Sequence, residues 1–259
     1  MSKHQGICRL CGELRNLTFE HIPPKAAFND RQQLFEVTNE MLRGRAYKKF
    51  PRGIGQYSLC QQCNNLTGAW YGREFVRWVE QGMEWYTKLG NRGLFYLPYY
   101  IKPLPVLKQI LVMAVAMMNE ATLQDHQELR QFLLNREQKY LPDKYEVYTY
   151  FNKDGKPRFA SDMVVAKWDS TIRITYVQAE VALPPFGYCV CTKTEGQQSL
   201  AQYEQLCDIT WFGRYEYNEW KPIQLRLPDR ETHEPFPLDF RNKSEIQEHL
   251  QKSRSDKSE

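Results

Sequence analysis

Four cysteines in the first quarter of the chain form the pattern with the clearest chemistry. They make two Cys-x-x-Cys pairs, Cys8 with Cys11 and Cys60 with Cys63, and 48 residues lie between the pairs. Four thiolates in two such pairs can complete a tetrahedral Zn²⁺ site with Zn–S bonds of about 2.3 Å. The entropic cost of closing a loop grows only logarithmically with its length, so the long separation is compatible with one shared site. We expect a structural zinc ion, with four unrelated cysteines as the alternative.

The two pairs predict different local structures. The spacing suits a tight knuckle turn at Cys8 and Cys11, and a helix beginning at Cys63 suits the second pair. The partial positive charge at a helix N-terminus favours thiolates there.

Glu20 and His21 form a second chemical pair, ten residues after the first cysteines. A closed four-thiolate site accepts no further ligand, so metal binding by this pair would require a second ion. The carboxylate suits a hard cation such as Mg²⁺, and a neutral imidazole can take a proton from water. Pro23 and Pro24 stiffen the chain after the histidine. Taken alone, the pair is weak evidence for a metal site, and a surface histidine is the favoured interpretation.

The order of these parts resembles the HNH endonuclease family. A Cys-x-x-Cys pair is followed by an acidic-His-x-Pro run and then by a Leu-Cys-x-x-Cys-Asn segment at 59–64. The resemblance covers about residues 8–72. It is strongest to the zinc-stabilised members, in which a ββα-metal motif is built on a treble-clef knuckle.

The resemblance implies a role for each matching residue. His21 corresponds to the general base that activates water, and Glu20 corresponds to the carboxylate, usually Asp, that ligates a catalytic Mg²⁺ or Mn²⁺. Asn64 stands where the last histidine of the motif usually lies and would be a second ligand to that cation. Members also carry an asparagine about five residues before the third cysteine. Gly55 occupies that place, so Gln56 is the candidate to supply the amide, the alternative being a degenerate site.

Basic residues are concentrated in the same part of the chain. Residues 1–92 contain 14 Lys and Arg against 8 Asp and Glu, whereas the remainder contains 21 against 23. Segment 41–53 has five basic residues and no acidic one. Such a segment can neutralise several phosphates, although a solvated loop would have the same composition. The candidate nucleic-acid contacts are Lys25, Arg43, Arg45, Lys48, Lys49 and Arg52.

The composition limits the class of protein. At 42% hydrophobic and 25% charged residues, the 259-residue chain can bury a core. Its longest apolar stretch, 109–118, is far shorter than the roughly 20 residues of a membrane span, and the N-terminus has no apolar signal-like run. Seven cysteines, an odd number, in paired spacings favour ligation over disulfides. We therefore expect a cytoplasmic protein without membrane contact.

The elements that would position these residues follow from the hydrophobic periodicity. The pattern predicts helices at 65–89, 106–121 and 123–138, the second of them buried, and a Pro- and Tyr-rich connector at 96–105. From Lys144 the period approaches two, which predicts an antiparallel sheet of at least five strands. Asp154-Gly155 is expected to turn between the first strand and the next.

This pattern predicts an α+β protein with a helical middle segment and a C-terminal antiparallel sheet, and the resemblance implies a zinc-bound treble-clef domain of HNH type at the N-terminus. The expected units are 1–95, 96–142, 143–242 and a charged flexible tail at 243–259.

The resemblance implies metal-dependent hydrolysis of nucleic-acid phosphodiesters, with DNA as the expected target, in the setting of a bacterial anti-phage or mobile-element nuclease. Two alternatives remain open. One is a catalytically inert, zinc-structured nucleic-acid-binding module. The other is a protein-interaction module that works through its C-terminal half, which is also the expected docking surface for a regulatory protein or ligand.

Overall fold

Three antiparallel strands near the N-terminus carry the residues of chemical interest. In the computed structural model they are β1 (Gln5–Ile7), β2 (Leu14–His21) and β5 (Gly55–Cys60), in the order β1-β2-β5. The residues that the structure describes are 4–31, 33–39, 44–89, 95–152, 157–168, 172–193 and 206–230.

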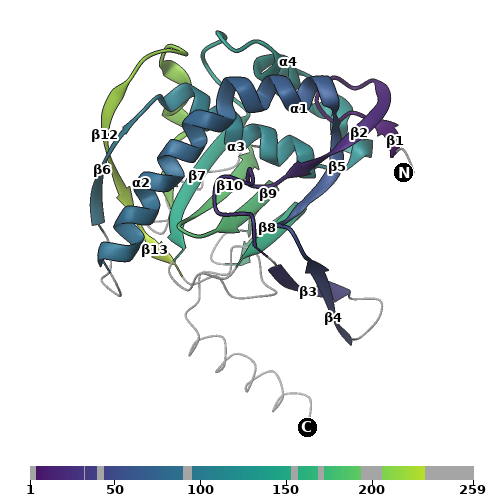
Figure 1. Ribbon diagram of the computed structural model, residues 1–259, viewed down its shortest axis with the longest axis horizontal. Helices are drawn as coiled ribbons and strands as arrows, with labels where there is room; N and C mark the ends of the chain where they lie inside the picture. The colour runs from purple at the N-terminus through teal and green to yellow at the C-terminus, as the bar shows by residue number, and fades with distance from the viewer. Residues whose placement is uncertain are drawn as a thin grey trace.

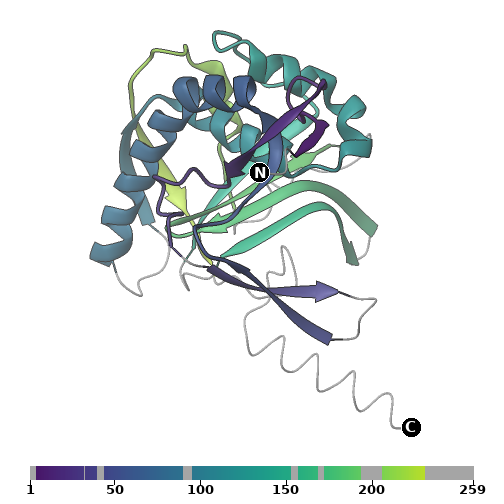
Figure 2. The ribbon, with the colours of Figure 1, turned by 45° about the vertical axis from the view of Figure 1, so that its right-hand side comes forward.

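A two-stranded ribbon is inserted between β2 and β5. Its strands, β3 (Gln33–Asn39) and β4 (Gly44–Phe50), pair antiparallel with each other and form a separate sheet. Figures 1 and 2 show that this ribbon extends away from the body of the protein. The described part of the basic segment, residues 44–53, is β4 and the turn that follows it.

One long helical segment follows β5 and crosses the front of the molecule (Figure 1). It consists of α1 (Gln61–Thr67), a π-helical turn η2 (Gly68–Gly72) and α2 (Arg73–Leu89). The predicted helix at 65–89 is thus present but begins four residues earlier, directly after Cys60. The π-helical turn was not expected from the periodicity.

The next helix, α3 (Pro103–Met117), is the buried helix that the sequence predicted. It begins three residues before the expected start because Pro103, with its fixed φ, is well suited to a first helical turn. It ends at Met117, and the Asn119 side chain accepts a hydrogen bond from the Ala121 backbone N–H. The expected polar helix is a 3₁₀ turn, η3 (Glu120–His126), followed by a short α4 (Gln127–Leu134).

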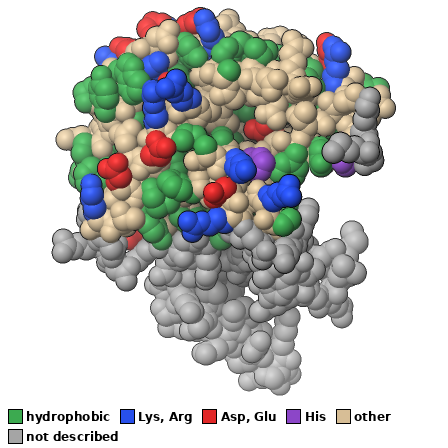
Figure 3. All heavy atoms as spheres, in the orientation of Figure 1, with side chains coloured by type: hydrophobic (Ala, Val, Ile, Leu, Met, Phe, Trp, Pro, Cys, Tyr) green, Lys and Arg blue, Asp and Glu red, His purple; other side chains and the backbone are tan. Residues whose placement is uncertain are grey.

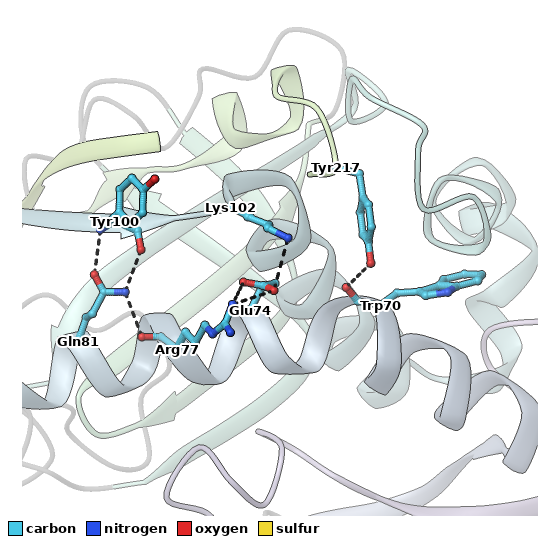
Figure 4. Close-up of polar contacts among 7 residues, drawn as sticks. All are labelled: Trp70, Glu74, Arg77, Gln81, Tyr100, Lys102 and Tyr217. Atoms are coloured by element: carbon cyan, nitrogen blue, oxygen red, sulfur yellow. Dashed lines mark hydrogen bonds and ion pairs between the residues drawn. The ribbon is translucent and has the colours of Figure 1, made fainter. Parts of the chain in front are cut away.

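The Pro- and Tyr-rich segment is a strand rather than a connector. β6 (Phe95–Ile101) pairs antiparallel with β12 (Lys221–Leu227). A proline is tolerated because this ribbon has only two strands and its outer edge needs no N–H from residue 98. The Gln81 side chain of α2 covers that edge, accepting from Tyr100 N at 2.8 Å and donating to Tyr100 O at 3.1 Å (Figure 4).

The C-terminal half forms the expected sheet, with a different connectivity. Its strand order is β11-β7-β10-β9-β8, and the short β13 (Asp229–Arg230) adds to β7 in parallel. β7 and β8 are not neighbours, so the hairpin expected at Asp154-Gly155, a turn outside the described residues, is wrong. The alternating pattern also predicts a strand at 208–217, but residues Thr210–Arg214 of this segment form a 3₁₀ turn. These elements are β7 (Tyr145–Asn152), β8 (Arg158–Trp168), β9 (Ile172–Leu183), β10 (Phe186–Thr192), β11 (Cys207–Asp208) and η5 (Thr210–Arg214).

The helices pack on the sheet around one large hydrophobic core, which includes residues from Cys8 to Leu227. Trp78 of α2 stacks on Phe186 of β10 with ring centroids 4.7 Å apart. Gly82 allows this approach, because a Cβ there would lie 2.2 Å from the Phe186 ring. The result is a mixed α+β fold with largely antiparallel sheets, as the sequence predicted. Among the described residues, no helix is long and apolar enough to cross a bilayer. The tail at 243–259 lies outside the described residues.

Candidate metal centre and active-site pocket

The four cysteines of the two pairs come together as the sequence predicted. Their sulfur atoms all lie within 4.8 Å of one another, and none forms a disulfide. Zn–S bonds of about 2.3 Å in a tetrahedron set sulfur–sulfur distances of about 3.8 Å, so modest side-chain adjustment would accommodate the ion. These residues can hold a metal ion such as zinc.

Local structure explains why the two pairs meet. The chain turns tightly after Cys8, with Gly12 N donating to Cys8 O at 2.7 Å, and Gly12 adopts a φ of 79° that suits glycine. Arg130 of α4 donates from Nε to Leu10 O at 2.9 Å and holds this knuckle. Cys60 ends β5 and Cys63 lies in the first turn of α1, close to the predicted helix N-terminus.

Within the cluster, Cys8 is the favoured thiolate. The Cys63 thiol donates to its sulfur and lowers the pKa of Cys8 to about 4, and the Cys60 backbone N–H donates to the same sulfur at 3.2 Å. The pKa of Cys63 is raised, because its thiol makes that hydrogen bond and is partly desolvated. The pKa of Cys11 is raised by burial. A bound metal ion would deprotonate all four sulfurs.

A pocket of about 610 Å³ opens beside this cluster. It is bordered by the end of β2, the following Pro24–Ala26 turn, the α1–η2–α2 segment and one residue of α3. Glu20, His21 and Asn64 all line it. Residues 43 positions apart in the chain are thus brought to one cavity.

The His21 ring is oriented by the backbone. Its Nε2 lies 3.2 Å from Arg52 O, and a carbonyl can only accept, so Nε2 carries the proton. Nδ1 of the neutral ring then retains the lone pair that a general base needs. Phe19 contacts the ring edge-on at a centroid distance of 5.0 Å.

The two expected cation ligands differ in their surroundings. Glu20 is 7% exposed, and desolvation raises the pKa of its carboxyl to about 7. A cation beside it would favour the carboxylate. Asn64 donates from Nδ2 to Thr18 Oγ1 at 3.1 Å, which leaves its Oδ1 as the group suited to a cation.

Gln56 does not line this pocket. Its amide nitrogen donates to Ala116 O near the C-terminal end of α3, which also accepts from the Arg9 guanidinium. The glycine before it is required by the close contact of two strands, because a Cβ on Gly55 would lie 2.0 Å from Glu20 O. No larger residue fits at the position where the family carries asparagine.

Asn29, which the sequence analysis missed, holds the ends of the connection between β2 and β5. It is fully buried, donates to Pro23 O at 2.7 Å and Ile54 O at 2.8 Å, and accepts from Ile54 N at 2.7 Å. The neighbouring Gly53 has a φ of 92°, and a Cβ there would lie 1.9 Å from Asn29 O. The turn sequence Asn29-Asp30 was the only available signal, and it gave no indication of these distant partners.

Cationic side chains lie at the mouth of the pocket. Lys25 and Arg73 line it and are exposed, and neither makes an ion pair with another described residue. Arg77 also lines it but is held by Glu74, with Nη1 3.1 Å from Oε2, and Lys102 Nζ lies 3.7 Å from the same carboxylate (Figure 4). On the face seen in Figure 3, acidic and basic side chains are interspersed, and no broad basic patch forms among the described residues.

The remaining expected nucleic-acid contacts lie on the inserted segment. Arg45, Lys48 and Lys49 belong to β4, and Arg52 lies exposed in the turn that contacts His21 through its carbonyl. Arg43 lies outside the described residues.

Comparison of the chain with protein-family models, curated proteins and solved structures found no match.

Proposed function

We propose that this protein is a metal-dependent endonuclease of HNH type that hydrolyses phosphodiester bonds in nucleic acid. The observation that carries the proposal is the convergence of Glu20, His21 and Asn64 on one pocket beside the four-cysteine cluster. The local order of elements supports it. A knuckle bearing Cys8 and Cys11, the strands β2 and β5, and the helix α1 follow one another in the order expected of the family's ββα motif.

Each residue has a definite task in the proposed reaction. His21 takes a proton from water at Nδ1, and the water oxygen forms a bond to phosphorus while the P–O bond to the leaving oxygen breaks. The leaving oxygen then takes a proton from solvent. Glu20 and Asn64 would hold a Mg²⁺ or Mn²⁺ ion, which when bound neutralises charge on the phosphate and the leaving oxygen. Cys8, Cys11, Cys60 and Cys63 would hold zinc as a structural ion.

Asn29 takes the positioning task in this proposal. Its three hydrogen bonds fix Pro23, two residues after His21, relative to Ile54, two residues after Arg52. The family's missing asparagine would orient the same loop, and Gln56 is instead engaged with α3. Basic residues of β4 and the following turn belong to the segment between β2, which carries Glu20 and His21, and β5. They are the proposed contacts to the DNA backbone.

The direct test is incubation of the purified protein with supercoiled plasmid DNA and Mg²⁺ or Mn²⁺. We expect nicking by the wild type and its loss in His21→Ala. His4→Ala is the matched control, because His4 is exposed and does not line the pocket, and it should cut like the wild type.

Equal nicking by wild type and His21→Ala would show contamination and refute the proposal, as would the absence of cleavage of DNA and RNA over a range of metals. A zinc-containing protein that binds nucleic acid without cutting it would instead support the inert-module alternative. The engagement of Gln56 away from the pocket is the feature that favours this alternative.

A further inference from the structure

Gln109 of α3 is a buried polar residue that the proposed reaction does not use. It is 2% exposed, lines the pocket, and its Oε1 has no hydrogen-bond partner among the described residues. The η2 turn forms the adjacent wall, where a Cβ on Gly72 would lie 3.7 Å from this oxygen. An amide oxygen without a partner among the described residues therefore belongs to a residue that lines the cavity.

The neighbouring Lys108 makes the contrast clear. It is also fully buried, and its ammonium donates to Phe132 O, Asn135 O and Arg136 O at 3.0, 2.6 and 3.3 Å. Buried polar groups in folded proteins nearly always find partners in this way, since an unpaired one destabilises the fold. The Gln109 oxygen has no such partner among the described residues, and because Gln109 lines the pocket, a ligand there could supply one.

The rest of the pocket restricts the chemistry of that ligand. Its walls include the Phe19 ring, Val76 and the side-chain-free surfaces of Gly68 and Gly72, which suit a flat aromatic group. Lys25 and Arg73 at the mouth suit a phosphate. The volume of about 610 Å³ lies within the range of roughly 300–1,000 Å³ typical of small-ligand sites.

We propose that the pocket receives one unstacked nucleotide of the substrate, with a donor of its base meeting Gln109 and its phosphate at Lys25 and Arg73. This inference rests on the proposed function, because it places the base beside the bond that His21 would attack. An amide that is 2% exposed is out of reach of a base stacked within a duplex. The preferred substrate is therefore single-stranded nucleic acid or a nucleotide extruded from a duplex.

Binding can be measured separately from cleavage in the His21→Ala background, without added Mg²⁺ or Mn²⁺. The probes are one fluorescent oligonucleotide as single-stranded DNA, as single-stranded RNA and as the DNA duplex of the same sequence, followed by anisotropy. We expect tighter binding of a single strand than of the duplex. Adding Gln109→Met, an unbranched apolar replacement, should weaken single-strand binding about tenfold.

Two further variants separate a recognition role from a structural one. The same change at the exposed Gln131 of α4 should leave binding unchanged. Gly68→Leu should narrow the pocket, because Gly68 lines it and a Cβ at this position meets no atom within 4 Å. The melting temperature of Gln109→Met should equal or exceed that of its parent, since an unpaired buried acceptor is removed.

Single-strand binding that is unchanged in both Gln109→Met and Gly68→Leu overturns the inference, as does a preference for duplex or the absence of binding to any probe. If Gln109→Met nicks plasmid as fast as an active wild type, the proposed nuclease activity is supported and the proposed nucleotide site is refuted. If the wild type never cuts but single-strand binding depends on Gln109, the site stands and the nuclease fails.

Discussion

The four-cysteine cluster and the adjacent pocket share the helix α1, yet their polar groups differ in how well they are paired. In the cluster, each sulfur lies near three others, and backbone N–H groups support the thiolate of Cys8. In the pocket, burial disfavours the charge of Glu20, and the Gln109 acceptor has no partner among the described residues. Removing groups from the cluster should therefore cost stability, whereas removing them from the pocket should cost activity.

The largest expected effect is the loss of the cluster. Cys60→Ser removes a sulfur that ends β5 and precedes α1, so zinc should be lost and the free energy of unfolding should fall by about 3 kcal/mol or more. Metal analysis should find about one zinc per chain in the wild type, and urea denaturation gives the stability.

The matched control is Cys207→Ser, which changes a half-buried cysteine outside the cluster and should keep the zinc. A wild type that contains no zinc, or a Cys60→Ser protein that retains it with unchanged stability, would remove the distinction between the two regions.

The second-largest effect is expected at Asn29, whose hydrogen bonds hold the loop that follows His21. Asn29→Ala leaves Pro23 O and Ile54 N without their buried partner, which should lower the free energy of unfolding by about 2–4 kcal/mol. Because the loop after His21 loosens, plasmid nicking should fall further than the unfolded fraction explains. Urea denaturation and the nicking rate, both at a temperature where the variant remains folded, separate the two effects.

Asn16→Ala is the control, because Asn16 is exposed on β2 and outside the pocket. It should change the free energy of unfolding by no more than about 0.5 kcal/mol and should leave the nicking rate unchanged. If Asn29→Ala loses stability but keeps the full nicking rate of its folded fraction, Asn29 supports the fold alone.

The sequence predicted what depends on short spacing. Two Cys-x-x-Cys pairs predicted a four-sulfur cluster, and the apolar run before Met118 predicted the buried helix α3. Strand pairing was harder, because an alternating pattern states which face is buried and does not identify the neighbour. β12 has the expected alternation but pairs with β6, whose proline suggested a connector, and β7 pairs with β10 rather than with the next strand.

The candidate site was predictable to the same degree. Glu20, His21 and Asn64 follow a motif and were placed in one pocket, whereas Asn29 and Gln109 have no local pattern. An asparagine beside an aspartate resembles a surface turn, and a glutamine within an apolar helix resembles a tolerated exception. Only the tertiary structure brings Asn29 to Ile54 and Gln109 to the wall of η2.

The smallest expected effect concerns Lys108, which precedes Gln109 on α3 and whose buried ammonium has three hydrogen-bond partners. Burial lowers the pKa of Lys108 to about 7, whereas an unfolded lysine has a pKa near 10.5. Between these values the unfolded state holds more protons, so the free energy of unfolding should rise with pH, by at most about 1.4 kcal/mol per unit. The contribution is complete above the unfolded pKa and is lost as the pH falls towards 7.

Three carbonyl oxygens favour the ammonium form and oppose the desolvation, so we expect a rise of only about 1 kcal/mol between pH 7.5 and pH 9.5. Urea denaturation over this range should lose that rise in Lys108→Met and retain it in Lys88→Met, whose lysine is exposed. Equal slopes in Lys108→Met and the wild type would mean that the carbonyls fully offset burial. Lys108 would then remain charged over this pH range. Its ammonium would be fully hydrogen-bonded, whereas the Gln109 oxygen has no partner among the described residues.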